Sequence, residues 1–353
     1  MRLLQSDAYV KLLQRTTLTN VDWNQFRDKV IMISGATGMI GSFLIDLVMY
    51  KNTSAQLHCT VIALGRNEEK AQQRFKEYWN SELFKFYVCD INMPICSIDE
   101  RVDYVLHAAS NTHPLAYSTD PIGTVSSNII GTKNMLDYAA EHEVKRFVFA
   151  SSVEVYGENR GDIDAFNEDY CGYINCNTLR AGYPESKRAG EALCQAYISQ
   201  KNMDIVIPRL ARTYGPTMLM SDSKAISQFI KKGLAKENIV LKSEGDQLYS
   251  YTFVADAVTG ILCCMLCGEC GMAYNVVGNE SDITLKELAK LIADYVCKEV
   301  VFDLPSEEER KGYSTATKAI MTGNRIATLN WKASASIKTG IQETMSILSE
   351  VIE

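Results

Sequence analysis

The amino-acid sequence predicts an α/β fold with a doubly wound parallel sheet, and three observations support this prediction. Short apolar runs alternate with longer amphipathic stretches over residues 30–208. Continuous apolar runs are typical of strands buried on both faces of a parallel sheet. The first run breaks into Gly35, Gly38 and Gly41 and then continues as a helical pattern. A strand, a glycine-rich turn and a helix in this order are typical of the Rossmann dinucleotide-binding fold.

The elements of this domain follow one another in a regular order. Apolar runs predict strands at 30–33, 61–64, 87–88, 102–109, 147–150 and 205–208. The amphipathic stretches between them predict helices near 40–50, 68–79, 122–142 and 184–201.

The same pattern divides the chain into parts. Residues 1–28 are polar and helix-prone and predict an N-terminal arm, and residues 29–208 form the expected dinucleotide-binding domain. The rhythm loosens after residue 208, which predicts a smaller substrate lobe formed by 209–250 and 268–353. The apolar segment 251–267 is expected to return to the first domain, so that the lobe is discontinuous in sequence.

Composition limits the class of protein. The chain has 353 residues, of which 46% are hydrophobic and 22% charged, as in ordinary globular proteins. A net charge of −7 argues against a nucleic-acid partner. No apolar run approaches the roughly 20 residues that span a bilayer, and polar residues interrupt the first segment too early for a signal peptide. We therefore expect a cytoplasmic protein without a membrane partner.

The eleven cysteines are scattered and odd in number, which favours reduced thiols over a disulfide scaffold. Cys263, Cys264, Cys267 and Cys270 lie close enough in sequence to suggest a zinc or iron–sulfur site. The first three fall on one face of an apolar helix, however, and no histidine lies nearby. Core packing is the preferred interpretation, and no metal is expected.

The glycine spacing has a physical explanation. Gly35 permits a tight exit from the strand, Gly38 leaves room between backbone N–H groups and a pyrophosphate, and Gly41 allows the helix to pack closely on the sheet. The helix N-terminus then supplies unpaired donors and a partial positive charge. An ordinary strand-to-helix turn is the alternative interpretation.

The choice of cofactor depends on the end of the second strand. No carboxylate stands there for the ribose of NAD, and Arg66 is placed to face a 2′-phosphate, which favours NADP over NAD. Arg66 stacking on adenine or capping the next helix remains an alternative. Asp90 follows the third strand and is placed to accept from the adenine amino group, whereas we interpret His107 as structural.

A pair of residues on the last helix of the domain predicts the chemistry. Tyr183 and Lys187 lie one helical turn apart on the same face. A neighbouring ammonium group lowers the pKa of a phenol, so Tyr183 is a candidate base for a hydroxyl that loses hydride from its carbon. Ser152 and Glu154 follow a predicted strand, where Ser152 is a candidate to orient the reacting oxygen and Glu154 to act on a neighbouring carbon. Turn chemistry is the alternative for Ser152.

Taken together, the glycine turn, Asp90, His107, Ser152 and the Tyr183/Lys187 pair resemble the extended short-chain dehydrogenase/reductases of the NAD-dependent epimerase/dehydratase family, which modify nucleotide sugars. The resemblance extends over nearly the whole chain from residue 29. Within that group the sequence is most similar to UDP-glucuronate decarboxylases, through residues 120–132, 152–157, 172–175 and 180–183.

The resemblance implies roles for individual residues. The implied catalytic residues are Ser152, Glu154, Tyr183 and Lys187. The implied cofactor contacts are Gly35, Thr37, Gly38, Met39, Ile40, Gly41, Arg66, Asp90, Ile91, Ala108, Ala109, Ser110, Tyr183, Lys187 and Pro208. Ser152, Arg180, Arg212 and Tyr249 are the implied contacts to a nucleotide-diphosphate sugar. The helices at 122–142 and 184–201 correspond to those that form a four-helix dimer interface in the family, so a homodimer is expected.

The resemblance also implies a reaction, in which the cofactor oxidises the sugar at C4 and Tyr183 acts as the base. In the decarboxylases the resulting β-keto acid loses carbon dioxide and the hydride returns. Decarboxylation or epimerisation is therefore the leading expectation, and a reductase that consumes NADPH is the runner-up, motivated by Arg66. The 4,6-dehydratases usually carry an aspartate where this chain has Val153, which makes dehydration less favoured. A retired relative that serves as a nucleotide-binding scaffold is an alternative of another class.

The sequence departs from the family at its expected anion site. Tyr249 stands where an arginine usually binds the substrate diphosphate, and Thr217 where decarboxylases usually have arginine. The Arg-Arg-Pro-Asp stretch expected near 318–321 is absent. Arg212 replaces the usual asparagine and is our candidate for a substituted anion contact, with a salt bridge inside the lobe as the alternative.

Overall fold

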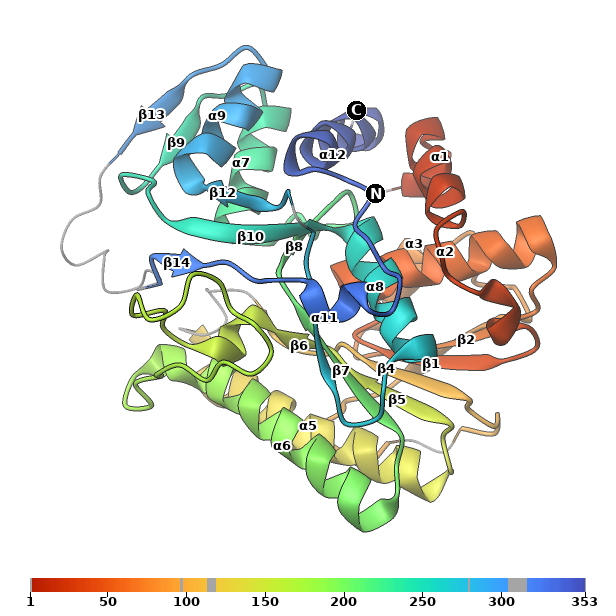
Figure 1. Cartoon of the computed structure of the whole chain (residues 1–353). Helices are drawn as coiled ribbons and strands as arrows, with labels where there is room; N and C mark the ends of the chain where they lie inside the picture. The colour runs from red at the N-terminus through yellow and green to blue at the C-terminus, as the bar shows by residue number, and fades with distance from the viewer. Residues whose placement is uncertain (1, 96–97, 113–118, 279, 304–315, 353) are drawn as a thin grey trace.

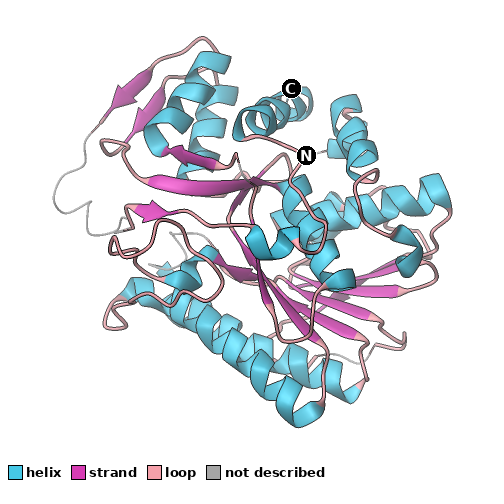
Figure 2. Cartoon of the chain, viewed as in Figure 1, coloured by secondary structure: helices cyan, strands magenta, loops and turns pink. Residues whose placement is uncertain are grey.

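A parallel sheet in the order β11-β7-β5-β4-β1-β2-β3, with short β6 beside β7, forms the centre of the molecule (Figures 1 and 2). The computed structural model describes residues 2–95, 98–112, 119–278, 280–303 and 316–352. The strands of this sheet are β1 (Val30–Ser34), β2 (Thr60–Gly65), β3 (Phe84–Val88), β4 (Tyr104–His107), β5 (Arg146–Phe149), β6 (Ser151–Ser152), β7 (Ile205–Leu210) and β11 (Ala273–Val276). The order reverses direction between β1 and β4, and ligands of doubly wound sheets bind at the carboxyl ends beside such a point.

Alternate residues of each strand enter different cores. In β1, Ile31 and Ile33 pack into the core on one face, whereas Met32 packs into the core on the other. The same alternation places Val61 and Ile62 of β2 on opposite faces. Because successive side chains of a strand point in opposite directions, a continuous apolar run can fill two cores at once.

Helices cover both faces of the sheet (Figure 1). On one face, α5 (Pro121–Glu141) and α6 (Gly182–Lys201) lie side by side. On the other face, α2 (Met39–Ala55) packs against α8 (Val254–Cys267), and α1 (Asp7–Thr16) packs on both of them. The short α3 (Glu68–Arg74) leads into β3, and short 3₁₀ segments occur at Leu3–Gln5, Trp23–Phe26, Val153–Tyr156 and Leu179–Ala181.

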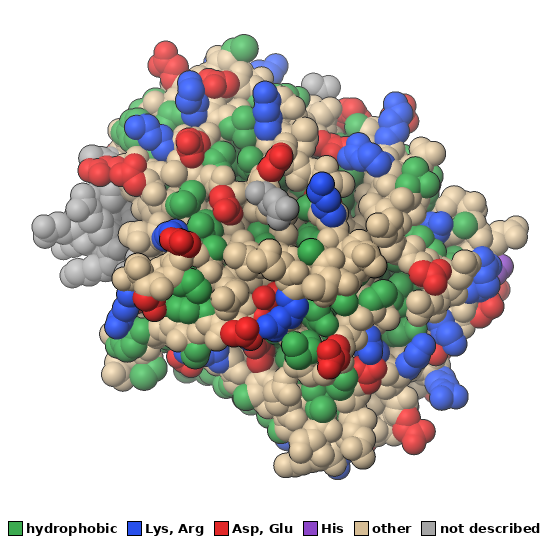
Figure 3. Space-filling view, viewed as in Figure 1, with side chains coloured by type: hydrophobic (Ala, Val, Ile, Leu, Met, Phe, Trp, Pro, Cys, Tyr) green, Lys and Arg blue, Asp and Glu red, His purple; other side chains and the backbone are tan. Residues whose placement is uncertain are grey.

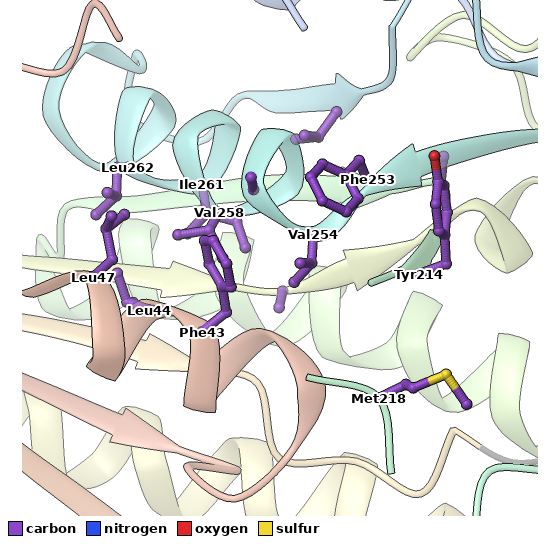
Figure 4. Packing of buried hydrophobic residues seen from close by; sticks show 14 of the residues in the cluster. Phe43, Leu44, Leu47, Tyr214, Met218, Phe253, Val254, Val258, Ile261 and Leu262 are labelled. Carbon is purple, nitrogen blue, oxygen red and sulfur yellow. The ribbon is translucent and has the colours of Figure 1, made fainter. Parts of the chain in front are cut away.

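The contact between α2 and α8 is a close apolar interface. Phe43, Leu44 and Leu47 of α2 point toward the side chains of Val258 and Ile261 on α8 (Figure 4). All five side chains are fully buried. Since burying a large apolar side chain contributes about 1.5–3 kcal/mol, this interface is a major source of stability.

The second part of the chain is built from two smaller sheets and the helices beside them. One sheet has the order β12-β10-β14 with β8 also paired to β10, and β13 pairs with β9. The remaining bounds are β8 (Arg212–Tyr214), α7 (Ala225–Leu234), β9 (Ile239–Leu241), β10 (Leu248–Phe253), β12 (Asp282–Thr284), α9 (Leu285–Tyr295), β13 (Val300–Phe302), β14 (Lys318–Ala319), α11 (Asn324–Ala327) and α12 (Ile337–Ile352).

The structure shows how the predicted division of the chain relates to its contacts. Helix α8, within the 251–267 segment, packs against β5 and β7 of the large sheet. Strand β11, from the 268–353 range assigned to the substrate lobe, pairs in parallel with β7. The chain therefore contributes to the large sheet after residue 268 as well as before it. Helix α1, from the predicted arm, packs on α2, α8 and α12.

Observed boundaries differ from the predicted ones by a few residues. The helix predicted at 68–79 ends at Arg74, because Phe75 leaves the helix and packs its ring 5.2 Å from that of Phe84. Strand β3, predicted at 87–88, begins at Phe84. The strand predicted at 102–109 covers only Tyr104–His107.

The cysteine-rich helix differs from its prediction in one respect. Cys263 and Cys264 are buried in the core, as expected, but Cys267 is exposed at the end of α8, so the three thiols do not share one buried face. All the cysteines of the described residues are free thiols. Within those residues, none of the helices combines the length and apolar character needed to cross a membrane. The face shown in Figure 3 carries acidic and basic side chains in mixture.

A buried ion pair joins α1, α2 and α3. Asp46 of α2 is fully buried and forms a salt bridge with Arg74 of α3. The hydroxyl of Tyr9 on α1 donates a hydrogen bond to the same carboxylate (2.6 Å). Because a buried carboxylate is costly without a partner, these two contacts determine how the three helices meet.

Replacing Arg74 by alanine should lower the free energy of unfolding by about 3–5 kcal/mol, because it leaves the Asp46 carboxylate buried without its cation. Urea denaturation measures this change. The exposed pair between Lys133 and Asp137 provides the control, and Lys133→Ala should cost about 0.5 kcal/mol or less. Equal losses for the two variants would contradict this account of the Asp46 site.

Candidate functional site

The glycine turn after β1 is tightly packed against the end of β4. Gly35 has a φ of +74°, and a Cβ atom there would lie 2.8 Å from backbone atoms of Ala108 and Ala109. At Gly41 a Cβ atom would lie 2.6 Å from the carbonyl oxygen of Gly35. Both positions therefore exclude a side chain for steric reasons, as the sequence predicted.

The same turn leaves the start of α2 open to an anion. Gly38 is the N-cap of α2 and, having no side chain, forms no capping hydrogen bond. The first N–H groups of a 17-residue helix then face the cavity lined by Gly38, Met39 and Ile40. Since these donors and the helix dipole favour negative charge, the turn fits a dinucleotide pyrophosphate.

A cavity of about 810 Å³ adjoins the glycine turn and extends toward the second part of the chain. It lies at the carboxyl ends of β1, β4 and β5 and is closed by residues of α7, β9 and β10. Most of the predicted site residues line it: Gly35, Gly38, Met39, Ile40, Gly41, Ala108, Ser110, Ser152, Glu154, Arg180, Tyr183, Lys187, Arg212 and Tyr249.

Six predicted cofactor contacts do not line this cavity: Thr37, Arg66, Asp90, Ile91, Ala109 and Pro208. Arg66 is exposed and directly follows β2, and the helix cap at this point comes from Asn67 instead. The Asp90 carboxylate accepts two hydrogen bonds from Asn92, each 3.0 Å long. Pro208 lies inside β7, opposite Tyr274 of β11, where both are buried.

Tyr183 is buried at the start of α6, with its hydroxyl group hydrogen-bonded to Ser152 and Ser110. Burial raises the pKa of Tyr183 well above its usual value. The two serine hydroxyls act in the opposite direction, and the nearby Glu154 carboxylate raises the pKa further. The structure thus places Ser152 and Glu154 close to Tyr183, as expected, and adds Ser110 to this group.

The expected effect of Lys187 on Tyr183 is not present in this structure. The Lys187 ammonium donates to the carbonyl oxygen of Ala150 (2.8 Å) and lies 4.8 Å from the centre of the Phe149 ring. Burial lowers the pKa of Lys187 to about 8. The prediction of a lowered Tyr183 pKa is therefore wrong for the protein alone, because burial outweighs the contribution of a lysine directed at a backbone carbonyl.

Asn128 of α5 supports this group of residues, and the sequence analysis did not identify it. Its side-chain oxygen accepts from the Ser110 hydroxyl (2.7 Å), and its amide donates to the Ser186 hydroxyl (2.8 Å). Ser186 in turn donates to the backbone oxygen of Tyr183 (2.8 Å). A buried asparagine that links two elements has no local sequence signal beyond its polarity on an otherwise packed helix face.

His107 connects β1, β4 and α5 behind the site. Its Nδ1 lies 2.7 Å from the Ser34 hydroxyl and its Nε2 lies 3.0 Å from the Thr132 hydroxyl. Burial, with a smaller contribution from the Lys187 charge, lowers the pKa of His107 to about 3. The ring is consequently neutral near pH 7 and holds two strands and a helix in register.

Glu154 lies between two arginines. Its carboxylate is 3.8 Å from the Arg180 guanidinium and 3.5 Å from that of Arg212. The Arg212 guanidinium also lies 3.9 Å from the centre of the Tyr249 ring. Two arginines that were predicted separately thus approach one carboxylate at the wall of the cavity, and Tyr249 contacts one of them.

Other lining residues were missed by the sequence analysis. Lys224, Lys232 and Lys242 line the part of the cavity distant from the glycine turn, on or near α7 and β9. Lys224 is paired with Asp222 (3.8 Å). No motif marks these lysines, because they reach the cavity through the fold of the second part of the chain.

Thr217, which stands where decarboxylases usually have arginine, forms a hydrogen bond to the backbone of α2. Its hydroxyl donates to the backbone oxygen of Met39 (2.9 Å). The loop after β8 is thereby attached to the first turn of α2, beside the glycine turn.

Comparisons with known proteins identify the family of this chain. A model of the NAD dependent epimerase/dehydratase family matches residues 31–277. The chain is similar to UDP-glucuronic acid decarboxylase 2 of Arabidopsis thaliana, with 29% identity over 316 residues, or 88% of this chain and 66% of the relative. It is 29% identical over 330 residues to UDP-glucuronic acid decarboxylase 1 of Danio rerio, covering 92% and 74% of the two chains. The chain therefore spans just under two thirds of the plant relative.

Solved structures share the fold. UDP-glucose 4-epimerase from Thermotoga maritima superposes with a TM-score of 0.76 at 21% identity, covering 92% of this chain and 100% of the other. UDP-glucuronic acid 4-epimerase from Bacillus cereus gives a TM-score of 0.76 at 21% identity, covering 91% and 99%. The family model covers most of the large sheet, the glycine turn and the Ser152, Tyr183 and Lys187 group. This chain belongs to the NAD-dependent epimerase/dehydratase family.

Proposed function

We propose that this protein is an NAD(P)-dependent enzyme that modifies a nucleotide-diphosphate sugar through a 4-keto intermediate, with decarboxylation of UDP-glucuronate as the leading reaction. One observation carries the proposal: Ser152, Tyr183 and Lys187 line the cavity that begins at the glycine turn. The names of the relatives from Arabidopsis thaliana and Danio rerio support the decarboxylase assignment. Epimerisation uses the same first step.

The residues of this chain would divide the work as follows. The Tyr183 oxygen takes the proton of the C4 hydroxyl, and the Ser152 hydroxyl donates a hydrogen bond to the phenolate, whereas the Ser110 hydroxyl donates to Asn128. Lys187 would hold the nicotinamide ribose, and the glycine turn the pyrophosphate. Bound NAD(P) supplies the acceptor for the hydride that leaves C4 and returns it at the end.

The carboxylate of the sugar is lost between the oxidation of C4 and its reduction. Once C4 is a ketone, the bond between C5 and the carboxylate carbon breaks, carbon dioxide leaves, and the electron pair moves into the ketone as an enolate. C5 then takes up a proton, and the returned hydride and the proton from Tyr183 restore the C4 hydroxyl. The cofactor is unchanged overall, so none is consumed.

Two other functions differ from this one in what they consume. A reductase would use one NADPH for each sugar, and Arg66 at the end of β2 motivates that candidate. A retired scaffold would bind nucleotide without turnover, but such a protein has no need of Ser152, Tyr183 and Lys187 together.

Mass spectrometry of a panel of nucleotide sugars, incubated with the purified protein and either cofactor, tests the proposal. Conversion of UDP-glucuronate to a product lighter by carbon dioxide, without net loss of NAD(P)H, is expected. Loss of one NADPH for each product would favour the reductase. Binding without any conversion across the panel would favour the scaffold.

We also propose a cytoplasmic location, because free thiols at all described cysteines are typical of a reducing compartment.

Replacing Tyr183 by phenylalanine should lower kcat by at least about 100-fold, because the proton acceptor is removed while the ring remains. The variant should bind NAD(P) nearly as well as the wild type. Tyr197→Phe, on the same helix with its hydroxyl bonded to Asp137, is the matched control and should stay within about twofold of the wild-type rate. Retained activity in Tyr183→Phe would remove this residue from the mechanism.

Replacing Arg66 by alanine tests the cofactor preference. If Arg66 binds the 2′-phosphate, the variant should lose about tenfold or more in affinity for NADP and less than about threefold for NAD, measured by calorimetry. Arg101→Ala, an exposed arginine before the amino end of β4 and thus at the opposite end of the strands, should change neither affinity. A parallel change in both affinities would show that Arg66 does not discriminate between the cofactors.

We propose a homodimer formed through α5 and α6. Ile122 and Ile130 on α5 are exposed by 81% and 46%, and apolar side chains exposed on a helix face favour association. The double variant Ile122→Asp/Ile130→Asp should give a monomer in light scattering. Leu18→Asp, equally exposed but located after α1, should leave the mass of the dimer unchanged. A wild-type monomer would contradict the proposal.

A further inference from the structure

Arg212 is held in place by an aromatic ring. The guanidinium lies 3.9 Å from the centre of the Tyr249 ring, a distance at which a cation is attracted to the ring face. The Tyr249 hydroxyl donates to the carbonyl oxygen of Ala316 (2.7 Å), so the ring itself is fixed. Strands β8 and β10 pair in parallel, which keeps the two side chains on neighbouring strands.

Two arginines approach the Glu154 carboxylate. Arg180 and Arg212 each approach the single Glu154 carboxylate, at 3.8 and 3.5 Å. A third cation of the same wall, Lys224, is already opposed by Asp222 (3.8 Å). Among the residues that the structure describes, two guanidinium groups therefore approach one carboxylate at the wall of the cavity.

These contacts are looser than charge-assisted hydrogen bonds, which are usually 2.7–2.9 Å long. A guanidinium group has five N–H donors in a planar fork that matches the two oxygens of a carboxylate. The cluster formed by Arg180, Arg212 and Glu154 is therefore suited to bind a second carboxylate beside that of Glu154.

The position of this cluster indicates which part of a substrate would contact it. The backbone N–H of Glu154 donates to the Ser152 hydroxyl (3.3 Å), and Ser152 is hydrogen-bonded to the Tyr183 hydroxyl. An anion at Arg212 would therefore lie beside the carbon that Tyr183 addresses. A substituent of the reacting sugar ring meets this condition better than the more distant diphosphate.

We propose that Arg212, held by Tyr249, is the residue that selects a nucleotide sugar carrying a carboxylate on the carbon next to the oxidised one. This inference rests on the proposed function and names the contact that distinguishes an acidic from a neutral sugar.

The test measures binding of UDP-glucuronate and UDP-glucose by calorimetry, to NAD-loaded protein carrying Tyr183→Phe so that no turnover occurs. Arg212→Gln in this background should lose about 10–100-fold in affinity for UDP-glucuronate and less than about threefold for UDP-glucose. Arg212→Lys, which keeps the charge but not the planar fork, should recover part of the loss. Tyr249→Leu should lose about 2–5-fold for the acidic sugar alone.

Arg160→Gln is the control, because Arg160 is an exposed arginine that also lies over a tyrosine ring, that of Tyr173, and does not line the cavity. It should change neither affinity. Equal losses for both sugars in Arg212→Gln, or no loss, would overturn the inference while conversion of UDP-glucuronate by the wild type left the proposed function standing. If wild-type protein binds NAD but neither binds nor converts any nucleotide sugar, the proposed function fails and the inference fails with it.

Discussion

The close approach of Gly35 to the end of β4 is the constraint on which the site depends. No side chain fits between this residue and the backbone of Ala108 and Ala109, and its left-handed backbone directs the chain into α2. The contact determines where α2 begins relative to the sheet. The helix N-terminus, the ends of β4 and β5, and the start of α6 then surround one cavity. A change at this point would displace the first turn of α2 from the ends of β4 and β5 and from Tyr183 at the start of α6.

The cavity combines two different electrostatic environments. Near the glycine turn, backbone N–H groups and a helix dipole supply partial positive charge. Deeper in, burial raises the pKa of Tyr183 and lowers the pKa of Lys187. Such perturbed groups in a cleft are typical of sites built to move protons. The protein alone therefore holds Tyr183 in its neutral form, and the serine hydroxyls supply the hydrogen bonds that oppose burial.

Local patterns predicted the central strands of the large sheet and the glycine turn, because strands such as β1 and β2 are buried on both faces and form continuous apolar runs. The edge strands were predicted less well: β3 has one buried residue of five, and β11 was assigned to the substrate lobe. The same reasoning identified Tyr183, Lys187 and Ser152, whose spacing follows from a helix and a strand end. It failed where chemistry depends on contacts between distant segments. Asn128 acts through Ser110, and the Lys187 ammonium is directed at Ala150, and neither contact has a signature along the chain. Lys224 lies before α7, in the second part of the chain. The strands there are too short to show a clear alternation of apolar and polar residues, so the sequence did not predict how this part folds over the cavity.

The junction between β10 and α8 has a mechanical consequence. Strand β10 ends at Phe253 and α8 begins at Val254, with no loop between them. One end of this continuous segment carries Tyr249, and the other packs on α2, the helix that starts at the glycine turn. The hydrogen bond from Thr217 to Met39 adds a second attachment between the same regions. Tyr249, in the wall of the cavity, and the helix that packs on α2 thus belong to one continuous strand-to-helix segment, so their relative position is set by the junction at residues 253 and 254 rather than by a loop.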